Sequence, residues 1–358
     1  MRAKEVALAI RVWAEENKLF KTDFPVELQI TLEEKDQVFE SLGISYRAES
    51  VFRHRGISAI AFNQAANEVI VFTEKSVPLK EQKLLPRDIS EGVTVRYIHA
   101  GTAHAGVPPT SAVASPYVMR GDAFACGGSI HPAKIVGAGT LGCLVRDSSG
   151  VLFGLTNNHV SGMSNYASIG EKILAPGHLD IAPGGINPFT IGYHERALPM
   201  VQGKPDNVNI ATNSDAALIR IASEDLVSSY QGNLYDTPSG TFELLAGQTI
   251  EKVGRTTGYT KGEVLGEVIG PHPIGYNTPG YGGHLSFFEP VFAIRGLNGE
   301  QFSQPGDSGS LITIQAGDVR FAVGLVFAGN STTGISYALS LQPILANLGV
   351  TLVNGHNT

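Results

Sequence analysis

The sequence is poor in features that mark several classes of protein. Only two cysteines, Cys126 and Cys143, occur in 358 residues, so the fold does not depend on a disulfide framework. No apolar run reaches the ~18 residues that a membrane-spanning helix needs. The first residues mix charged with apolar side chains and so predict no export signal. We therefore expect a cytoplasmic protein with no membrane partner and with both thiols reduced. A bridge between the two cysteines is the alternative.

Positive charge is scarce as well. The chain has 26 lysines and arginines against 33 acidic residues, for a net charge of −7, and it has no basic cluster. Nucleic acid is therefore not an expected partner. The glycine-rich stretch Gly280–Gly283 lacks the strand, lysine and helix of a phosphate-binding loop. Six histidines lack the paired spacing with Cys, Asp or Glu that zinc needs: His104, His131, His178, His194, His272 and His284. We predict no metal and no cofactor.

Turn-forming residues, by contrast, are abundant. The 42 glycines and 19 prolines separate short runs of Val, Ile, Leu and Phe, a pattern typical of antiparallel barrels. The N-terminal part differs, because apolar residues between Lys4 and Phe20 recur at helical spacing. The elements predicted after this helix complete a small α/β module: a strand at 24–30, a helix at 32–42, a strand pair at 56–63 and 68–74, and a strand at 92–99.

One serine is placed as a nucleophile would be. Ser308 lies in the glycine-containing turn Gln304–Ser310, just before the apolar run 311–314. The glycines let the backbone fold so that the amides of Gly306 and Ser308 converge on one point and stabilise an oxyanion. A serine alone is a poor nucleophile, so it needs a base and an acidic group that orients the base.

His159 and Asp215 are the residues that would supply those two partners. His159 follows a buried strand expected at 151–156, where a strand-to-loop junction more often faces a cleft than a core. Asp215 heads the apolar strand expected at 216–221, with no basic neighbour before Arg220. An aspartate beside His159 would fix the imidazole tautomer and stabilise the imidazolium formed when Ser308 loses its proton.

Two rival acids also lie between the histidine and the serine in the chain. Asp180 and Asp206 both occur in turn-forming sequence rather than at the head of a strand, so Asp215 is preferred. Each of the three chosen residues alone also fits a structural role. GDSG is compatible with an ordinary turn, the histidine with a structural side chain, and the aspartate with a charge at a strand edge.

The order His159, Asp215, Ser308 resembles the chymotrypsin-like, or trypsin-like, serine protease family. The contexts LTNNHV, SDAALI and GDSGS are each similar to the family's motifs, and three contexts in family order rarely coincide by chance. The segment Val253–Val264, VGRTTGYTKGEV, is similar to the hairpin that opens the second barrel in bacterial and plant trypsin-like proteases. Segments Gly139–Val145 and Asn157–Val160 resemble those of bacterial and plant members of the narrow-leaf type. The similarity spans about residues 126–345.

The resemblance implies a mainly β fold, a chymotrypsin-like double antiparallel β-barrel preceded by the small α/β N-terminal domain. We expect that domain at 1–100, a linker at 101–124, the first barrel at 125–224 and the second at 225–350. In the family, the histidine and aspartate come from the first barrel and the nucleophile from the second. Lys134–Gly137 superficially resembles the family's activation cleavage site, but we interpret it as part of a barrel strand that continues through Val145. Asp307 is then expected to find another partner or solvent.

The resemblance also implies a specificity pocket. Its floor would lie at Phe302, six residues before the nucleophile, and one wall at Phe327, Ala328 and Gly329. No acid lies at the floor, so a preference for Lys or Arg has no electrostatic basis, and a small or apolar substrate side chain is expected. Phe327 falls where the family usually has a serine that contacts the catalytic aspartate, which leaves the solvation of Asp215 open.

The predicted function is hydrolysis of peptide bonds in a protein or peptide substrate by a serine endopeptidase that requires no cofactor. The alternative is a catalytically idle protease fold that serves as a peptide-binding or scaffold module. Lipase-type acyl transfer lacks its G-x-S-x-G elbow and its Ser, Asp, His order. The N-terminal domain would recruit a substrate, cover the cleft until a signal releases it, mediate assembly, bind a regulatory partner or simply extend the core. The sequence does not choose among these.

Overall fold

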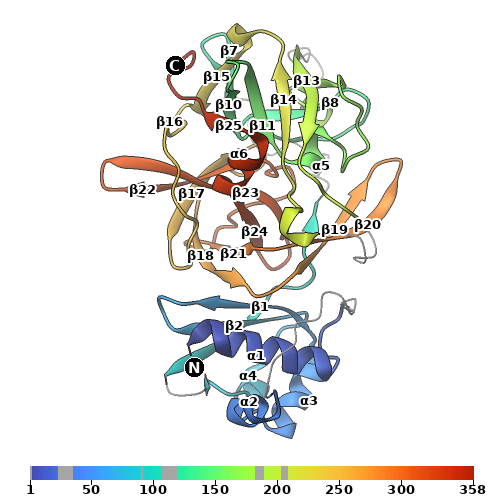
Figure 1. Cartoon of the computed structure of the whole chain (residues 1–358), viewed down its shortest axis with the longest axis vertical. Coiled ribbons are helices and arrows are strands. Elements are labelled where there is room, and N and C mark those ends of the chain that lie inside the picture. The colour runs from blue at the N-terminus through green and yellow to red at the C-terminus, as the bar shows by residue number, and fades with distance from the viewer. Residues whose placement is uncertain (1, 23–34, 90–91, 107–118, 182–188, 203–208) are drawn as a thin grey trace.

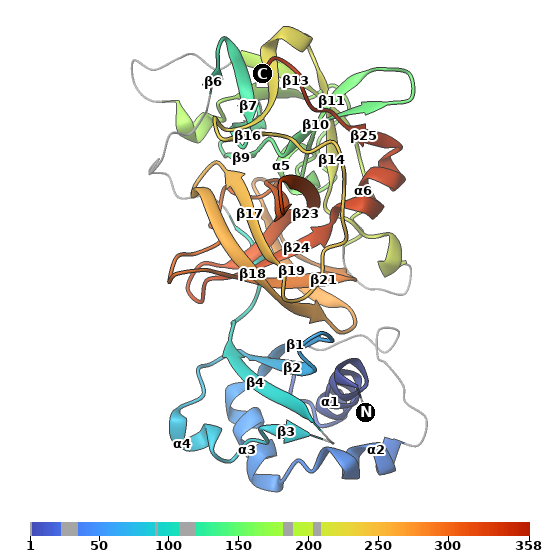
Figure 2. The same ribbon diagram turned by 90° about the vertical axis from the view of Figure 1, so that its left-hand side faces the viewer.

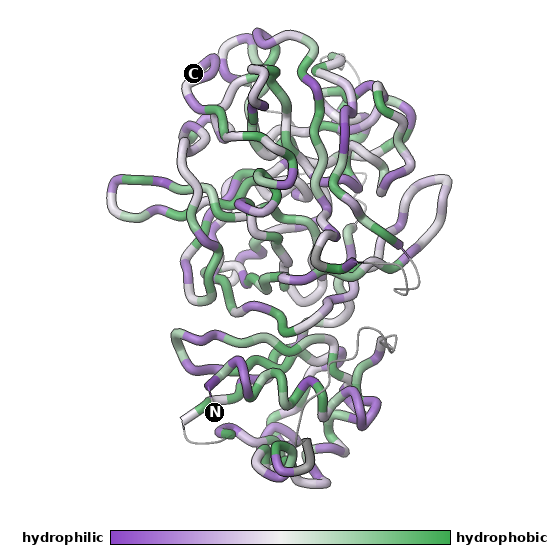
Figure 3. The backbone as a smooth tube through the Cα atoms, viewed as in Figure 1, coloured by the Kyte–Doolittle hydropathy of each residue, from purple (hydrophilic) through white to green (hydrophobic). Residues whose placement is uncertain are grey.

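The computed structural model describes residues 2–22, 35–89, 92–106, 119–181, 189–202 and 209–358 (Figure 1). It consists of an α/β unit at the N-terminal end and two β units above it, seen from two sides in Figures 1 and 2. Apolar residues concentrate along the first helix and along the strands of the β units, where the buried clusters lie (Figure 3). The burial of these apolar surfaces is the main favourable term for this arrangement.

The N-terminal unit packs helices against a small sheet. Its elements are α1 (Ala3–Glu16), α2 (Lys35–Leu42), α3 (Tyr46–Arg55), α4 (Leu79–Gln82), β1 (Ile57–Asn63), β2 (Glu68–Thr73), β3 (Asp88–Ile89) and β4 (Val93–His99). α1 buries Val6, Ile10 and Trp13 in the cluster that also holds strand residues. The expected strand at 24–30 and the expected start of the second helix lie outside the described residues. The sequence analysis missed α3, which is mostly polar and begins after Ser45, whose hydroxyl accepts from the Ala48 amide at 3.2 Å.

This unit is joined to the β units by backbone pairing and by one arginine. β1 pairs antiparallel with β2 and also with β18 (Gly258–Val268), with Ala61 opposite Val268. The buried guanidinium of Arg11 on α1 donates to the carbonyls of Ile269 at 2.7 Å and Pro271 at 3.3 Å. Hydrogen bonds from a charged donor are stronger than neutral ones, so α1 is fixed to the second barrel.

The first barrel is an eight-stranded sheet. In spatial order it runs β25 (Val350–Leu352), β10 (Cys143–Asp147), β11 (Leu152–Thr156), β14 (Ala217–Ile221), β13 (Phe189–Ala197), β12 (Lys172–Ala175), β8 (Ser129–Pro132) and β9 (Gly139–Thr140). A smaller sheet beside it contains β6 (Met119–Arg120), β7 (Ala123–Cys126), β15 (Val227–Gln231) and β16 (Tyr235–Asp236). The prediction of one strand from Lys134 to Val145 was wrong, because a turn occupies 133–138 and β9 begins only at Gly139.

The second barrel closes on itself through six strands. These are β17 (Thr249–Gly254), β18, β21 (Val291–Gly296), β24 (Ile335–Ser340), β23 (Val319–Asn330) and β22 (Leu311–Ala316). β19 (His272–Thr278) and β20 (Gly282–Phe288) form a hairpin attached to this sheet, and α6 (Leu341–Leu348) leads back to the first barrel. The chain therefore has the mainly β, chymotrypsin-like double-barrel fold that was expected.

Short strands occur in the stretch 101–124, which was expected to be only a linker. They are β6, the start of β7 and one strand of the second barrel's sheet. β5 (His104–Ala105) lies between β19 and β23 in the second sheet. It pairs parallel with β19 and antiparallel with β23. Two strand residues are too few to give a periodic sequence pattern, so only the long-range pairing reveals this element.

Candidate active site

Neighbouring strands of the first barrel bring the predicted histidine and aspartate together. His159 lies on the short helix α5 (Asn158–Ser161), which begins just after β11 ends. Asp215 lies just before β14, and β11 pairs antiparallel with β14 so that Thr156 is opposite Ala217. The end of one strand and the start of the other therefore meet at the same edge of the barrel.

The two side chains are in direct contact. His159 Nδ1 lies 2.6 Å from Asp215 Oδ2, and the His159 amide donates to Oδ1 at 3.0 Å. The Asp215 side chain is fully buried, whereas 14% of the His159 side chain is exposed. With Nδ1–H donating to the carboxylate, the other ring nitrogen, Nε2, is the one left to accept a proton.

The Asp215 carboxylate accepts a third hydrogen bond, from a residue that sequence reasoning missed. The hydroxyl of Tyr276, on β19, donates to Asp215 Oδ2 at 3.0 Å. Burial, followed by the neighbouring carboxylate, raises the pKa of Tyr276 well above its ordinary value, so the phenol stays a donor. The Tyr276 ring also lies 5.7 Å from the His159 ring, centroid to centroid. No sequence pattern links a tyrosine in one sheet to a carboxylate in another.

Phe327 does not take part in this network. It is fully buried and packs edge to face against Phe288, with ring centroids 5.2 Å apart. At this point in the network, Asp215 accepts a hydrogen bond from Tyr276 on β19, and the apolar Phe327 ring offers it none.

The turn that carries Ser308 is clamped to the first barrel. Gly309 has φ of +95°, and a Cβ there would lie 2.3 Å from the Thr156 hydroxyl and 2.4 Å from the Thr140 carbonyl, so only glycine fits. The Thr140 amide donates to the Ser308 carbonyl at 2.9 Å, and the Thr140 hydroxyl donates to the Gly306 carbonyl at 2.8 Å. Thr140 thus fixes the nucleophile turn against the barrel that holds His159.

Asp307 is held from the side of the second barrel. Its carboxylate accepts from the amides of Thr256 at 2.7 Å, Thr257 at 3.1 Å and Gln304 at 2.9 Å. The ammonium of Lys252, also fully buried, lies 3.5 Å away. Burial lowers the pKa of Lys252, while the Asp307 charge opposes that shift. The expected other partner of Asp307 is therefore the GRTTG turn together with Lys252.

Asp180, one of the two rival acids, is paired with a residue other than His159. Asp180 forms a buried ion pair with Arg255, whose Nε donates to Oδ2 at 2.8 Å, and it also accepts from the Ser129 hydroxyl at 2.5 Å. Asp206 lies outside the described residues. The turn that contains Ile135, Val136 and Gly137 lines a cavity with His159.

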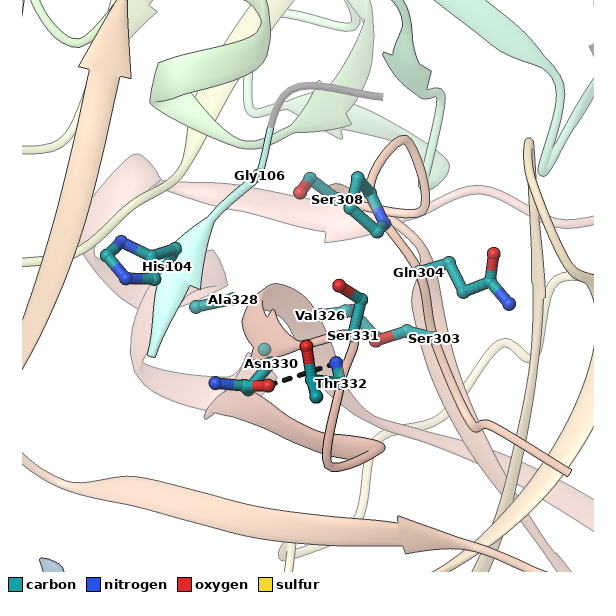
Figure 4. A pocket seen from close by; sticks show the side chains of 12 residues that line it. His104, Gly106, Ser303, Gln304, Ser308, Val326, Ala328, Asn330, Ser331 and Thr332 are labelled. Carbon is teal, nitrogen blue, oxygen red and sulfur yellow. Dashed lines mark hydrogen bonds between the residues drawn. The ribbon is translucent and has the colours of Figure 1, made fainter. Parts of the chain in front are cut away.

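Two cavities meet at Ser308. The first, of about 200 Å³, is lined by residues that include Ser303, Gln304, Ser308, Ala328, Gly329 and Asn330 (Figure 4). The second, of about 50 Å³, is lined by Ser308, His159 and Tyr276, among others. Within the described residues no hydrogen bond joins the Ser308 hydroxyl to His159. Catalytic hydrogen bonds are often long in unliganded sites and tighten when substrate binds.

The expected pocket is only partly correct. Ala328 and Gly329 line the first cavity, but Phe302 and Phe327 are not among the described lining residues. Phe302 is fully buried in the core of the second barrel, where a Cβ on Gly262 would lie 2.6 Å from its ring. Its apolar ring is held there by the barrel core. The described lining residues of the first cavity include no acid, and their one titratable side chain is His104.

The remaining findings concern metal ligands, the two thiols and membrane-spanning helices. No group of three or more His, Cys, Asp or Glu side chains in the described part of the chain is arranged to hold a metal ion. Cys126 and Cys143 are both buried free thiols, and burial raises the pKa of Cys143 to about 12. Among the helices described, none combines the length and apolar character needed to cross a bilayer.

Comparisons with known proteins found partial similarities. No protein-family model matches the chain. Protein NARROW LEAF 1 of rice, Oryza sativa subsp. japonica, is 28% identical over 218 residues, which are 55% of this chain and 35% of that protein. The chain thus spans about a third of the length of that relative.

The solved structures with a similar fold are serine proteases. Thermobifida fusca Protease A matches with a TM-score of 0.42 and 18% identity, over 64% of this chain and all of that chain. Nocardiopsis protease matches with a TM-score of 0.40 and 21% identity, over 63% of this chain and 97% of that one. The described strands define the class as a mainly β fold with a closed six-stranded barrel and a second β sheet.

Proposed function

We propose that this chain is a serine endopeptidase in which Ser308 is the nucleophile, His159 the general base and acid, and Asp215 the residue that orients the imidazole. The contact of 2.6 Å between His159 Nδ1 and the buried Asp215 carboxylate carries the proposal. It leaves Nε2 as the proton acceptor in a cavity that Ser308 also lines.

The proposed reaction proceeds in two halves. In the first, Ser308 Oγ attacks the substrate carbonyl carbon while its proton passes to His159 Nε2. The C–N bond then breaks, and the same proton goes to the leaving amine. In the second half, water gives a proton to His159 and attacks the acyl ester, which releases the carboxylic acid and restores the Ser308 hydroxyl. The N–H groups of Gly306 and Ser308 would stabilise the oxyanion, at ~3 kcal/mol for each donor.

The substrate class follows from the first cavity. Its described lining consists of hydroxyl, amide and apolar groups together with the imidazole of His104, and it holds no acid, so it gives a cationic side chain no charge partner. We propose a small, uncharged side chain at the position before the cleaved bond. A cytoplasmic location and a regulatory or substrate partner at the N-terminal unit are further proposals that come from the sequence alone.

Labelling with a fluorophosphonate probe tests the proposed nucleophile, because only an activated serine reacts rapidly. We expect the wild type to be labelled at Ser308 and Ser308→Ala to remain unlabelled.

Asp215→Asn should still fold but lose about ten thousandfold in kcat, since the imidazole would hold the wrong tautomer. Peptide-library cleavage, with Ser308→Ala as the control, then defines the substrate.

An inert Ser308 in a folded protein would contradict the proposal. That result would favour the idle, peptide-binding use of the fold instead. Identical library cuts by the wild type and by Ser308→Ala would show that a contaminant, and not this site, cleaves the peptides.

A further inference from the structure

The strand β5 lies where an extended peptide could reach Ser308. It fills the space between β19 and β23, with His104 opposite Gly329 in an antiparallel pair and opposite Gly275 in a parallel pair. Gly329 also lines the cavity beside Ser308. The chain thus adds a strand of its own to the edge of β23 that borders this cavity, in the manner of a peptide bound by strand addition.

The segment is held by hydrogen bonds along its length. The Ala103 carbonyl accepts from the Gly275 amide at 3.1 Å. The Asn330 side-chain amide donates to the Thr102 carbonyl at 2.9 Å, and the Thr333 hydroxyl donates to the Ala100 carbonyl at 2.8 Å. These contacts come from β19, from the end of β23 and from the turn after it, so they fix the residues that lead into β5.

The segment reaches the proposed nucleophile at Gly106. Gly106 and Ser308 line both cavities, and a Cβ on Gly106 would lie 2.8 Å from Pro305 in the nucleophile turn. Figure 4 shows Gly106 beside Ser308 and His104 farther along the same strand. Ala105 is buried and lines the second cavity with His159 and Tyr276. Because Gly106 has no side chain, it contributes none to fill the first cavity.

We propose that His104–Gly106 is an internal peptide ligand that occupies the edge of β23 in place of the acyl side of a substrate. The partner that this surface fits is therefore an extended peptide with small residues at the two positions that Ala105 and Gly106 hold. An external peptide competes with the internal strand, and the site is open only in molecules in which the strand has detached. The apparent affinity for peptide therefore equals the intrinsic affinity multiplied by the fraction of molecules in which the strand has detached.

A reversible tether tests this competition. His104 and Gly275 are Cα partners, and a Cβ on Gly275 would point at the His104 ring, 2.5 Å from Nδ1. Cysteines at paired positions lie within the Cα separation of a disulfide, so His104→Cys/Gly275→Cys should lock β5 when oxidised. The two native thiols are buried. The probe is a fluorescein-labelled hexapeptide with the sequence of residues 101–106, GTAHAG, and its binding is followed by fluorescence anisotropy.

We expect the oxidised variant to bind the hexapeptide at least tenfold more weakly than the reduced variant, and a reductant to restore binding. All of these proteins carry Ser308→Ala, so binding is measured without catalysis. Equal binding by the oxidised and reduced forms would overturn the proposal. The proposal deepens the proposed function, but an inert Ser308 in the labelling experiment would contradict that function alone and leave this binding result intact.

A second variant weakens the strand instead of locking it. Gly101 has φ of +63°, and a Cβ there would lie 2.7 Å from the Asn330 Nδ2 that holds the Thr102 carbonyl. Gly101→Val should therefore loosen the segment and tighten hexapeptide binding about tenfold. The matched control is Gly121→Val, which has φ of +59° but open space around its Cβ. Equal affinities for these two variants would also contradict the internal ligand.

Discussion

The hydroxyl of Tyr276 donates a hydrogen bond of 3.0 Å to the carboxylate of Asp215, across the boundary between two sheets. Both side chains are buried. The same carboxylate oxygen, Oδ2, binds His159 Nδ1. Asp215 Oδ2 thus accepts hydrogen bonds from the imidazole of the first barrel and from the phenol on β19. The position of β19 therefore affects the geometry of the proposed base.

Tyr276→Phe removes this bond and leaves the ring in place. A hydrogen bond to a charged group typically contributes about 1.5–3 kcal/mol, so we expect kcat to fall about tenfold or more while KM changes little. Steady-state kinetics on the best library peptide provide the measurement. Tyr281→Phe is the control, since Tyr281 is 55% exposed and stacks on Tyr166. A change in KM alone would indicate a substrate contact and not an effect on Asp215.

Thr140→Val tests whether the clamp on the nucleophile turn matters. The Thr140 hydroxyl donates to the Gly306 carbonyl and accepts from the Arg255 amide at 3.1 Å. The variant leaves both groups without this partner, which should lower the free energy of unfolding by about 1–3 kcal/mol. We also expect kcat to fall, because the amide of Gly306 follows the position of its turn. Urea unfolding and kinetics are compared with Thr94→Val, a change at an exposed strand position.

The sequence was informative where function depends on local context. His159, Asp215 and Ser308 each lie near the end or the start of a strand with a recognisable pattern, and the strands predicted at 151–156, 216–221 and 311–314 are present as β11, β14 and β22. The features that were missed depend on register between distant segments. Two of these features depend on β19. This strand carries Tyr276, which bonds to Asp215, and it pairs with β5.

The error at Phe302 has a related cause. Counting back from Ser308 predicts a position along the chain but not the direction of a side chain, and residues 301–304 lie in a segment without strand structure that leads into the nucleophile turn. The Phe302 ring lies in the barrel core, and the neighbouring Ser303 and Gln304 line the cavity instead. The C-terminal strand β25 was likewise unpredictable, because it pairs with β10, some 200 residues earlier in the chain.

Asp307→Asn tests the buried ion pair behind the nucleophile. It removes the carboxylate charge beside the fully buried Lys252 and one acceptor of the GRTTG amides. A buried charge that loses its partner destabilises a protein by about 3–5 kcal/mol. Guanidinium unfolding should show this loss.

The double variant Lys252→Met/Asp307→Asn gives the matched comparison for that prediction. It should be more stable than Asp307→Asn alone, because no buried cation is left without a partner. Lys252→Met alone completes the comparison. If the double variant loses as much unfolding free energy as Lys252→Met and Asp307→Asn lose together, the two side chains do not interact.

His272 predicts a dependence of stability on pH. This buried side chain packs on the ring of Tyr337, with centroids 4.7 Å apart. Burial, followed by the nearby charge of Arg11, lowers the pKa of His272 to about 3, from an ordinary value of 6.5. The unfolded chain therefore binds a proton at a pH where the folded chain does not. The stabilising contribution is fully present above about pH 6.5 and is lost progressively as the pH falls towards 3.

His272→Phe should remove this contribution, because phenylalanine fills the same space and has no proton to bind. Between pH 4 and 6 we expect the slope of unfolding free energy against pH to be smaller in the variant by up to ~1.4 kcal/mol per pH unit. Urea unfolding at several pH values gives the slope. His54→Gln, at an exposed position on α3, controls for the replacement of a histidine outside the buried core. If the wild type and His272→Phe have parallel curves, His272 takes up its proton in the folded protein as readily as in the unfolded chain, and burial does not disfavour its charged form.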